Sequence, residues 1–279
     1  MKKTKTETMM DFTSSDFASE MAKLGLPTSP QSLTKTNSKL AELPKSDASG
    51  SSTSPFWVMV TMTIITIVIS FLPFVDNLTH PFKIFATFIH EISHAIATVI
   101  TGGEITSHSL TVRWDGSGEV YHSGGWNFII GSAGYIGSTL FGCIMMLLAK
   151  SRKMAKPVLA AAGLLVLGFT LVYGATFGTY VMGIIGAASL FAVVALASKR
   201  AAYYFMSFLS VQTILNAVYD IKVLFGPHIG DSDAEILAKI YPIAPFIWSS
   251  AWLLISGGML AFVLINYYKM FKNTPQPKI

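Results

Sequence analysis

Long apolar segments are the feature that most constrains the fold of this chain. They recur from residue 55 to residue 268 and are separated by short polar stretches. A run of about 20 apolar residues can cross a bilayer as a helix, which satisfies its own backbone hydrogen bonds in lipid. Only 13% of the residues are charged, whereas a soluble domain usually has about 25%. The sequence therefore predicts an all-α, multi-pass integral membrane protein.

We expect about seven transmembrane helices. The predicted spans cover residues 55–75, 82–102, 126–149, 157–174, 178–197, 201–225 and 245–268. With seven spans, the lysines and arginines of residues 150–156, 199–200 and 269–278 all fall on one side, which the positive-inside rule assigns to the cytosol. The lysine-bearing segment before the first span would then lie on the opposite side, so a six-span arrangement stays open.

The third predicted span carries glycines at helical spacing. Gly131, Gly134 and Gly137 recur every three residues. Small residues at this spacing form a smooth surface on which another helix can pack closely.

Residues 103–125, between the second and third predicted spans, have a different pattern. Their sequence, GEITSHSLTVRWDGSGEVYHSGG, alternates polar and apolar side chains around Trp114-Asp115-Gly116. Alternation on both sides of a glycine-containing turn is typical of two antiparallel strands. We predict a short β-hairpin here.

Three regions follow from these patterns. Residues 1–54 are rich in Ser, Thr and Lys and cannot bury enough apolar surface to fold, so we expect a disordered tail. Residues 55–268 form the predicted membrane domain, and residues 269–279 a short basic tail. The net charge of +5 does not indicate nucleic-acid binding, because basic residues also gather in loops beside membrane helices. The lone Cys143 excludes a disulfide framework within the chain.

The second predicted span contains the sequence His90-Glu91-Ile92-Ser93-His94. Histidines four residues apart lie on the same face of a helix and can bind one zinc ion. A glutamate beside the first histidine can take the proton of a water that the metal activates, which is the chemistry of the H-E-x-x-H motif. Ionisable side chains are also costly within a membrane, so they mark candidate functional sites. The motif predicts a zinc centre with Glu91 as the catalytic base.

A catalytic zinc usually has three protein ligands, so one must come from elsewhere in the chain. Asp220 ends an apolar run and could reach the interior of the bundle, and we rank it first. Asp231 and Asp233 compete with it. Ser232 and Glu235 have the spacing of a capping box that opens a short helix, which gives this second segment a structural role of its own. His108, His122 and His228 lie outside the predicted spans and are expected to be solvated or loop histidines rather than metal ligands.

The sequence resembles the intramembrane zinc metalloproteases of the site-2 protease class, peptidase family M50, and in particular the M50B-like branch. The resemblance lies in FIHEISHAIATVITGG, DGSGEV, GGWNFIIGSAGYIGSTLFG, YDIKVLF and SDAEILA, in this order between residues 56 and 268. It implies a zinc metalloendopeptidase that cleaves membrane-anchored proteins in or near the bilayer, with His90 and His94 as zinc ligands and Glu91 as the base. We expect the lipid bilayer and these substrates as partners, and no nucleic acid.

Several alternatives remain open at this stage. The third ligand in this family lies in an Asp-Gly pair, whereas Asp220 precedes Ile221, and GSAGYIGSTL replaces an Asn-bearing segment after the hairpin. The chain could therefore be a catalytically inactive M50-like scaffold or regulatory binding protein. A transporter could use His90 and Glu91 as a proton relay, and a polar cluster could simply hold helices together.

Overall fold

The computed structural model describes Ser19, Lys23, Trp57 and residues 60–65, 76–149, 151–223 and 232–273. For residues 76–78, 216–223, 270, 271 and 273 it describes the backbone alone. Most of the predicted tail and of the first predicted span lies outside the described residues, although Trp57 and residues 60–65 are helical. The predicted boundaries of the three regions therefore stay predictions.

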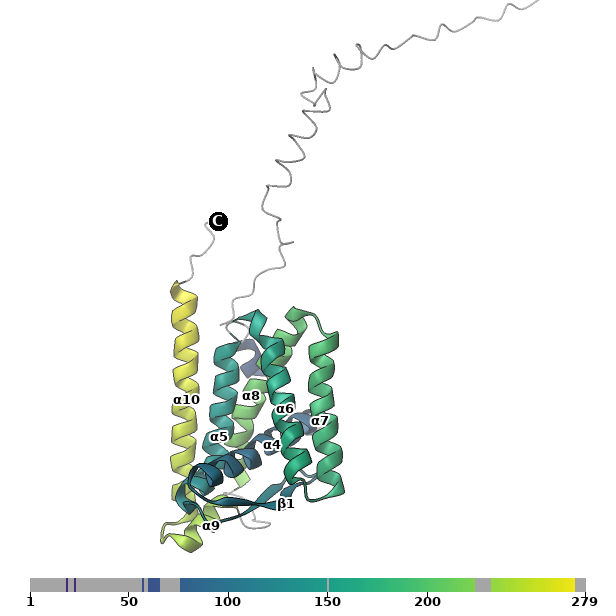
Figure 1. Ribbon diagram of the computed structural model, residues 1–279. Helices are drawn as coiled ribbons and strands as arrows, with labels where there is room; N and C mark the ends of the chain where they lie inside the picture. Colours follow the sequence, from purple (N-terminus) through teal and green to yellow (C-terminus); the bar gives the residue numbers. More distant parts are fainter. Residues whose placement is uncertain are drawn as a thin grey trace, which may run out of the picture. The chain divides into compact units, whose positions relative to one another are not determined.

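Six long helices make up most of the described chain: α4 (Asp76–Ile100), α5 (Asn127–Leu148), α6 (Ala155–Tyr173), α7 (Phe177–Leu196), α8 (Lys199–Val223) and α10 (Pro245–Asn273). Helices α5, α6, α7, α8 and α10 stand side by side, and α4 runs obliquely across their lower ends (Figure 1). By length and composition, α4, α5, α6, α7 and α10 could each cross a membrane. The helical membrane fold is confirmed, but the described residues do not confirm seven spans.

Apolar packing between α4, α5 and α8 forms the main core. Phe88, Ile89 and Ile92 of α4 are almost completely buried against it, as are Met145 and Met146 of α5. Helices α6 and α7 form an antiparallel pair at the side of this core. They approach closely because Gly183 of α7 faces the side chain of Thr170, where a Cβ atom would collide with the Thr170 hydroxyl.

The predicted hairpin is present between α4 and α5. Strand β1 (Glu104–Val112) pairs antiparallel with β2 (Gly118–Ser123), and Leu110 lies opposite Val120. The Asp115 carboxylate accepts hydrogen bonds from the Ser117 amide (2.8 Å) and hydroxyl (2.7 Å) in the turn. Gly116 has φ +86°, a conformation that strongly favours glycine. The turn that was predicted from Trp114-Asp115-Gly116 is therefore confirmed.

The hairpin is attached to both α4 and the α6–α7 pair. Thr87 of α4 donates a hydrogen bond of 2.8 Å to the carbonyl of Gly116. At the other side, Leu110 forms a bridge with Gly174, and the Val112 amide donates to the Thr179 hydroxyl at 3.0 Å. These contacts hold the hairpin alongside α4 and beneath the turn between α6 and α7.

We call this end of the bundle the foot, and the opposite end the head. The foot contains the hairpin, the short helix α9 (Asp233–Ile240) and the N-terminal ends of α5, α7 and α10. The head contains the C-terminal ends of α5, α7 and α10 and the N-terminal ends of α6 and α8, together with the short 3-10 helix η1 (Arg152–Met154). The Tyr267 hydroxyl of α10 donates to the Met146 carbonyl near the head end of α5.

Candidate metal centre

Helix α4 places His90 and His94 on one face, as their spacing predicts. Their Nε2 atoms are 3.0 Å apart, and the two rings meet edge to face with centroids 4.7 Å apart. The His90 side chain is 15% exposed and that of His94 is 8% exposed. The pair therefore lies largely inside the protein, and His90 is the more exposed of the two.

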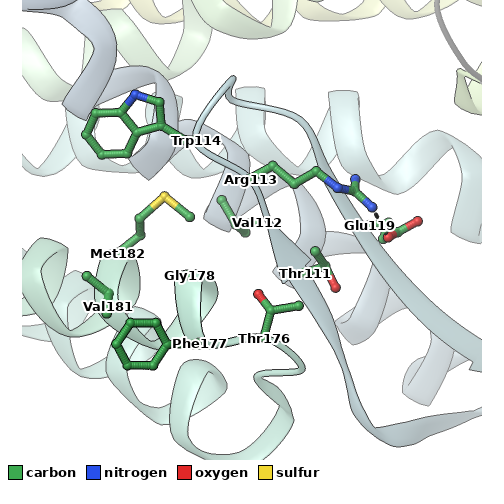
Figure 2. Close-up of a pocket in the computed structure, with 10 residues that line it drawn as sticks. All are labelled: Thr111, Val112, Arg113, Trp114, Glu119, Thr176, Phe177, Gly178, Val181 and Met182. Carbon is green, nitrogen blue, oxygen red and sulfur yellow. Dashed lines mark hydrogen bonds and ion pairs between the residues drawn. The ribbon is translucent and has the colours of Figure 1, made fainter.

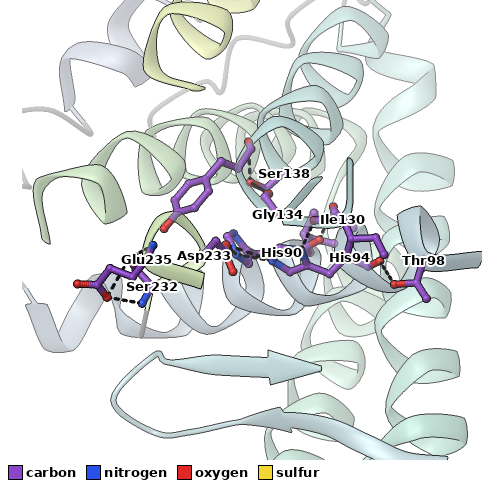
Figure 3. A network of polar contacts seen from close by, with 12 residues as sticks. His90, His94, Thr98, Ile130, Gly134, Ser138, Ser232, Asp233 and Glu235 are labelled. Atoms are coloured by element: carbon purple, nitrogen blue, oxygen red, sulfur yellow. Dashed lines mark hydrogen bonds and ion pairs between the residues drawn. The ribbon is translucent and has the colours of Figure 1, made fainter. Parts of the chain in front are cut away.

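Asp233 completes a group of three side chains. Its Oδ2 atom lies 3.0 Å from Nε2 of His90 and 3.3 Å from Nε2 of His94 (Figure 3). It comes from α9, 143 residues after His90 in the sequence. Among the described residues, these are the His, Cys, Asp and Glu side chains whose ligand atoms gather within 4.8 Å of one another.

The start of α9 explains why Asp233 is available for this contact. Ser232 is the N-cap, and its hydroxyl accepts a hydrogen bond from the Glu235 amide at 3.3 Å. The Glu235 carboxylate accepts one from the Ser232 amide at 2.8 Å. This capping box is the one that the sequence predicted. Ser232 and Glu235 accept hydrogen bonds from each other's backbone amides at the start of α9. The Asp233 carboxylate is not needed for this cap and points toward the histidines.

The three ligand atoms lie close to the spacing that a zinc ion imposes on its ligands. Zinc binds nitrogen and oxygen at about 2.0–2.2 Å, so a tetrahedral ion separates its ligand atoms by about 3.3 Å. The three measured separations are 3.0, 3.0 and 3.3 Å. Two imidazoles and one carboxylate are also an established ligand set for catalytic zinc. Geometry and chemistry both fit the metal.

The backbone of α5 fixes the orientation of His94. The Nδ1 atom of His94 lies 2.6 Å from the carbonyl oxygen of Ile130. Because a carbonyl can only accept a hydrogen bond, Nδ1 donates its proton to Ile130. The ring therefore presents Nε2 to Asp233, and once deprotonated this atom offers its lone pair to a metal. A second hydrogen bond of this kind is the usual way in which proteins orient a metal-binding histidine.

Small and aromatic side chains of α5 form the wall behind the histidines. A Cβ atom at Gly134 would collide with both imidazole rings. One position further on, Tyr135 meets the His90 ring edge to face at 4.8 Å and stacks on Trp252 of α10 at 4.8 Å. Gly131 similarly makes room for Leu237 of α9. Two glycines of the predicted helix-packing surface therefore make room for other groups: Gly134 for the two histidines and Gly131 for Leu237 of α9.

Glu91 lies on the neighbouring face of α4, beneath the hairpin. It is 5% exposed, and a Cβ atom at Gly118 of β2 would come within 2.6 Å of its Oε1 atom. Thr87, one turn earlier on α4, contacts the same glycine. The hairpin thus covers the carboxylate and limits its access to bulk water.

His90 and His94 determine the protonation state of the Asp233 carboxyl. Burial by itself would raise the pKa of this carboxyl, but the charge of His94 and hydrogen bonds from His90 and His94 lower the pKa below its ordinary value. Asp233 is therefore ionised, as a carboxylate ligand must be.

The other predicted ligands have different outcomes. Asp220 belongs to α8, but the structure describes only its backbone, so its role as a ligand stays a prediction. Asp231 and His228 lie outside the described residues. His108 bonds the Gly174 carbonyl at 3.1 Å and His122 lies on β2. The sequence ranked Asp233 below Asp220 because the capping box offered an explanation for every polar residue at the start of α9. In the structure only Ser232 and Glu235 form the capping box.

This fold and site define a multi-pass integral membrane protein with a candidate metal centre at one end of its helices. A family model described as Peptidase M50B-like matches residues 58–263. The match spans well over half of the chain, and the chain belongs to this family. No curated protein and no solved structure matched it. The resemblance drawn from the sequence is thereby confirmed at the level of the family.

Proposed function

We propose that this protein is an intramembrane zinc metalloprotease that hydrolyses peptide bonds in membrane-anchored proteins. One observation carries the proposal: in a member of a peptidase family, the His90/His94 pair meets a carboxylate from a distant helix at metal-ligand spacing. A polar cluster that only joined helices would not need three ligand atoms to converge on one point. A proton relay would likewise favour groups spaced along a path.

The roles of the residues follow from their positions. His90, His94 and Asp233 would hold zinc, with Asp233 in the place for which Asp220 was ranked first from sequence. When bound, zinc supplies a Lewis acid that polarises a peptide carbonyl and acidifies the attacking water. Ile130 keeps His94 in its ligating tautomer through a 2.6 Å hydrogen bond. Glu91 takes the proton of the water and passes it to the leaving amine.

Two features near the centre support a membrane-anchored substrate. An apolar groove of about 620 Å³ lies between α4, α5 and α10, with Ser93 and Ser132 among its lining residues. It could receive the helical anchor of a substrate. Within the described residues β2 pairs with β1 alone, and its Gly118 end lies against Glu91. An extended peptide that added to β2 would therefore pass beside the proposed base.

An inactive, zinc-binding scaffold is the second candidate. It is favoured by one departure from the family pattern: Asp233 is followed by Ala234, just as Asp220 is followed by Ile221, so neither forms the Asp-Gly pair. Metal binding alone does not distinguish the two candidates, whereas the effect of changing Glu91 does.

Zinc content of the purified protein tests the ligand set. We expect about one zinc per chain by elemental analysis, lost in His94→Ala and Asp233→Asn and kept in Asp220→Asn. Asp231→Asn is the matched control, because it removes a carboxylate two residues from Asp233. Zinc lost in Asp220→Asn and kept in Asp233→Asn would restore the assignment ranked first from the sequence.

Activity is tested with Glu91→Gln, which preserves shape and removes the base. We expect this variant to keep its zinc and to cleave a membrane-anchored reporter at least about 100-fold more slowly than the wild type, because general-base catalysis usually contributes 10²–10⁴-fold. Equal accumulation of the intact reporter with wild type, Glu91→Gln and empty membranes, across a panel of anchors, would favour the scaffold.

A further inference from the structure

A hollow of about 530 Å³ lies between the hairpin and the start of α7. None of the residues that line it belongs to the candidate metal centre. In Figure 2 the apolar side chains of Val181, Met182 and Phe177 lie on one side of this hollow, and the ion pair of Arg113 with Glu119 lies on the other. The hollow therefore offers an apolar surface and both signs of charge to one ligand.

The length of α7 places this hollow at the boundary between lipid and water. Helix α7 is apolar enough to cross a membrane and contains no Asp, Glu, Lys or Arg. At 1.5 Å per residue, its 20 residues extend over about 30 Å, which is the thickness of the hydrocarbon core. Its first residue, Phe177, therefore lies near the level of the lipid headgroups. Phe177 is 84% exposed, and Trp114 on the hairpin side of the hollow is 74% exposed, as is typical of aromatic rings at this interface.

Arg113 can bind an anion in addition to Glu119. Its Nη2 atom donates to Oε1 of Glu119, and within the described part of the chain the guanidinium makes no other hydrogen bond. The Arg113 side chain is 49% exposed. A guanidinium carries five N–H donors in a planar fork whose geometry suits phosphate oxygens. Arg113 thus has donors left for a phosphate in the hollow.

Glu119 and Trp114 can together bind a cation. The Glu119 carboxylate accepts hydrogen bonds from Arg113 and from the Tyr121 hydroxyl, the latter at 3.1 Å, and its side chain is still 35% exposed. Because a carboxylate has about four lone-pair sites, about two remain for an ammonium group. The exposed ring of Trp114 is also the aromatic surface that cations prefer. The hollow is therefore complementary to a molecule that carries both a phosphate and an ammonium group.

The apolar face of α7 continues from the hollow along the helix. Phe177, Val181 and Ile185 are spaced four residues apart, so they lie on one face. Ile185 is 61% exposed, and its neighbour Ile184 is also exposed. An acyl chain that starts in the hollow can follow this face into the hydrocarbon.

We propose that the hollow binds a phospholipid with a zwitterionic headgroup. Arg113 binds the phosphate, Glu119 and Trp114 bind the ammonium group, and one acyl chain follows α7 past Val181. The bilayer supplies such a ligand at the depth of the hollow, whereas a peptide would first have to displace lipid. An anionic lipid fits less well, because it has no cation to neutralise Glu119.

The lipid lies against the outer face of the hairpin. Successive residues of a strand point to opposite faces. Gly118 contacts Glu91 of α4 on the inner face, and its neighbour Glu119 lines the hollow. The hairpin is thus held between α4 and the lipid. This binding requires neither zinc nor cleavage.

Native mass spectrometry of the detergent-purified full chain tests the headgroup preference on the wild type. Dioleoyl phosphatidylethanolamine, phosphatidylcholine and phosphatidylglycerol share their acyl chains and differ in the headgroup. We expect the two zwitterionic lipids to bind about fivefold more tightly than the anionic phosphatidylglycerol, the effect of one partly exposed charge pair. Equal binding of all three lipids would overturn the proposal. Absence of lipid binding would also overturn it and leave the hollow to a protein partner.

Variants of the two charged residues test their separate roles. Arg113→Gln should weaken the binding of phosphatidylethanolamine about tenfold, the usual effect of losing a hydrogen bond to a charged group. Arg113→Lys keeps the cation and should weaken it less. Glu119→Gln should abolish the preference for zwitterionic over anionic lipid. Unchanged affinity in Arg113→Gln, or an unchanged preference in Glu119→Gln, would overturn the assignment of the headgroup.

Gly178→Leu tests the apolar part of the hollow. A Cβ atom at Gly178 meets nothing closer than 3.9 Å, so a larger side chain there extends into the hollow. We expect it to weaken the binding of all three lipids. Gly168→Leu in α6 is the matched control, because a Cβ atom at Gly168 meets nothing within 4 Å. Weaker binding in Gly178→Leu with unchanged binding in both charge variants would mean that the hollow holds acyl chains only, and would overturn the proposal.

Discussion

At the residue scale, the centre depends on what is absent from one position of α5. Gly134 lies where the two imidazole rings approach the helix, and any side chain there would occupy their space. The rings cannot move away freely, because Nδ1 of His94 is held by Ile130 and the His90 ring packs against Tyr135. Gly134 therefore supports the ligand geometry, although it contributes no ligand atom.

We predict that Gly134→Ala lowers zinc affinity at least about tenfold, comparable to the loss of a supporting contact around other metal sites. Competition with a chelating dye on the purified protein measures this. Gly168→Ala in α6 is the matched control, since a Cβ atom there meets nothing within 4 Å. Unchanged zinc affinity in Gly134→Ala would mean that the rings can shift, and that the wall formed by α5 does not set the geometry.

At the scale of an element, α9 is a helix of 8 residues that carries one ligand. So short a helix has little stability of its own, and it depends on its cap and on the contact of Leu237 with Gly131. Asp233 is the first residue of this helix, so fraying would move its carboxylate away from the histidines. The capping box therefore links helix stability to metal binding.

Ser232→Ala should destabilise the start of α9 by about 1 kcal/mol, the usual cost of losing an N-cap. We expect weaker zinc binding with little change in the thermal unfolding of the apo protein, because the rest of the bundle is unaffected. Ser232→Thr keeps the hydroxyl and should restore affinity. If Ser232→Ala and Ser232→Thr bind zinc equally, the cap is not what positions Asp233.

At the scale of the whole molecule, the candidate ligands join two distant parts of the chain. His90 and His94 belong to α4, and Asp233 belongs to a segment that follows α8. A metal bound to both would connect α9 to α4 directly, in addition to the contacts that each makes with α5. Helices α6 and α7 pack on each other and on β1, and contribute none of these ligands.

Zinc should therefore slow amide hydrogen exchange in α9 and around His90–His94, and leave α6 and α7 nearly unchanged. Free zinc at 100 times its dissociation constant should also stabilise the protein by about 2.7 kcal/mol, seen as a higher Tm that a chelator reverses. Mass spectrometry of the detergent-purified protein measures exchange in both regions in one experiment. Equal protection throughout the bundle would instead indicate a global effect of the metal.

The sequence by itself predicted most of the described elements and two of the three candidate ligands. Long apolar runs predict membrane helices because lipid offers the backbone no hydrogen-bond partners, and His90 and His94 share a face because a helix repeats every 3.6 residues. The hairpin turn and the capping box were readable for the same reason: each depends on residues close together in the sequence.

Only the tertiary structure shows that the Asp233 carboxylate lies beside the histidines, and at which end of the helices this group is found. Asp233 reaches His90 across 143 residues of sequence, and no local pattern encodes such a distance. The oblique course of α4 across the foot depends on how it packs against α5, α8 and the hairpin, and the length and hydropathy of its sequence do not predict that course. Periodicity shows which face of a helix is apolar, but only packing shows what that face meets.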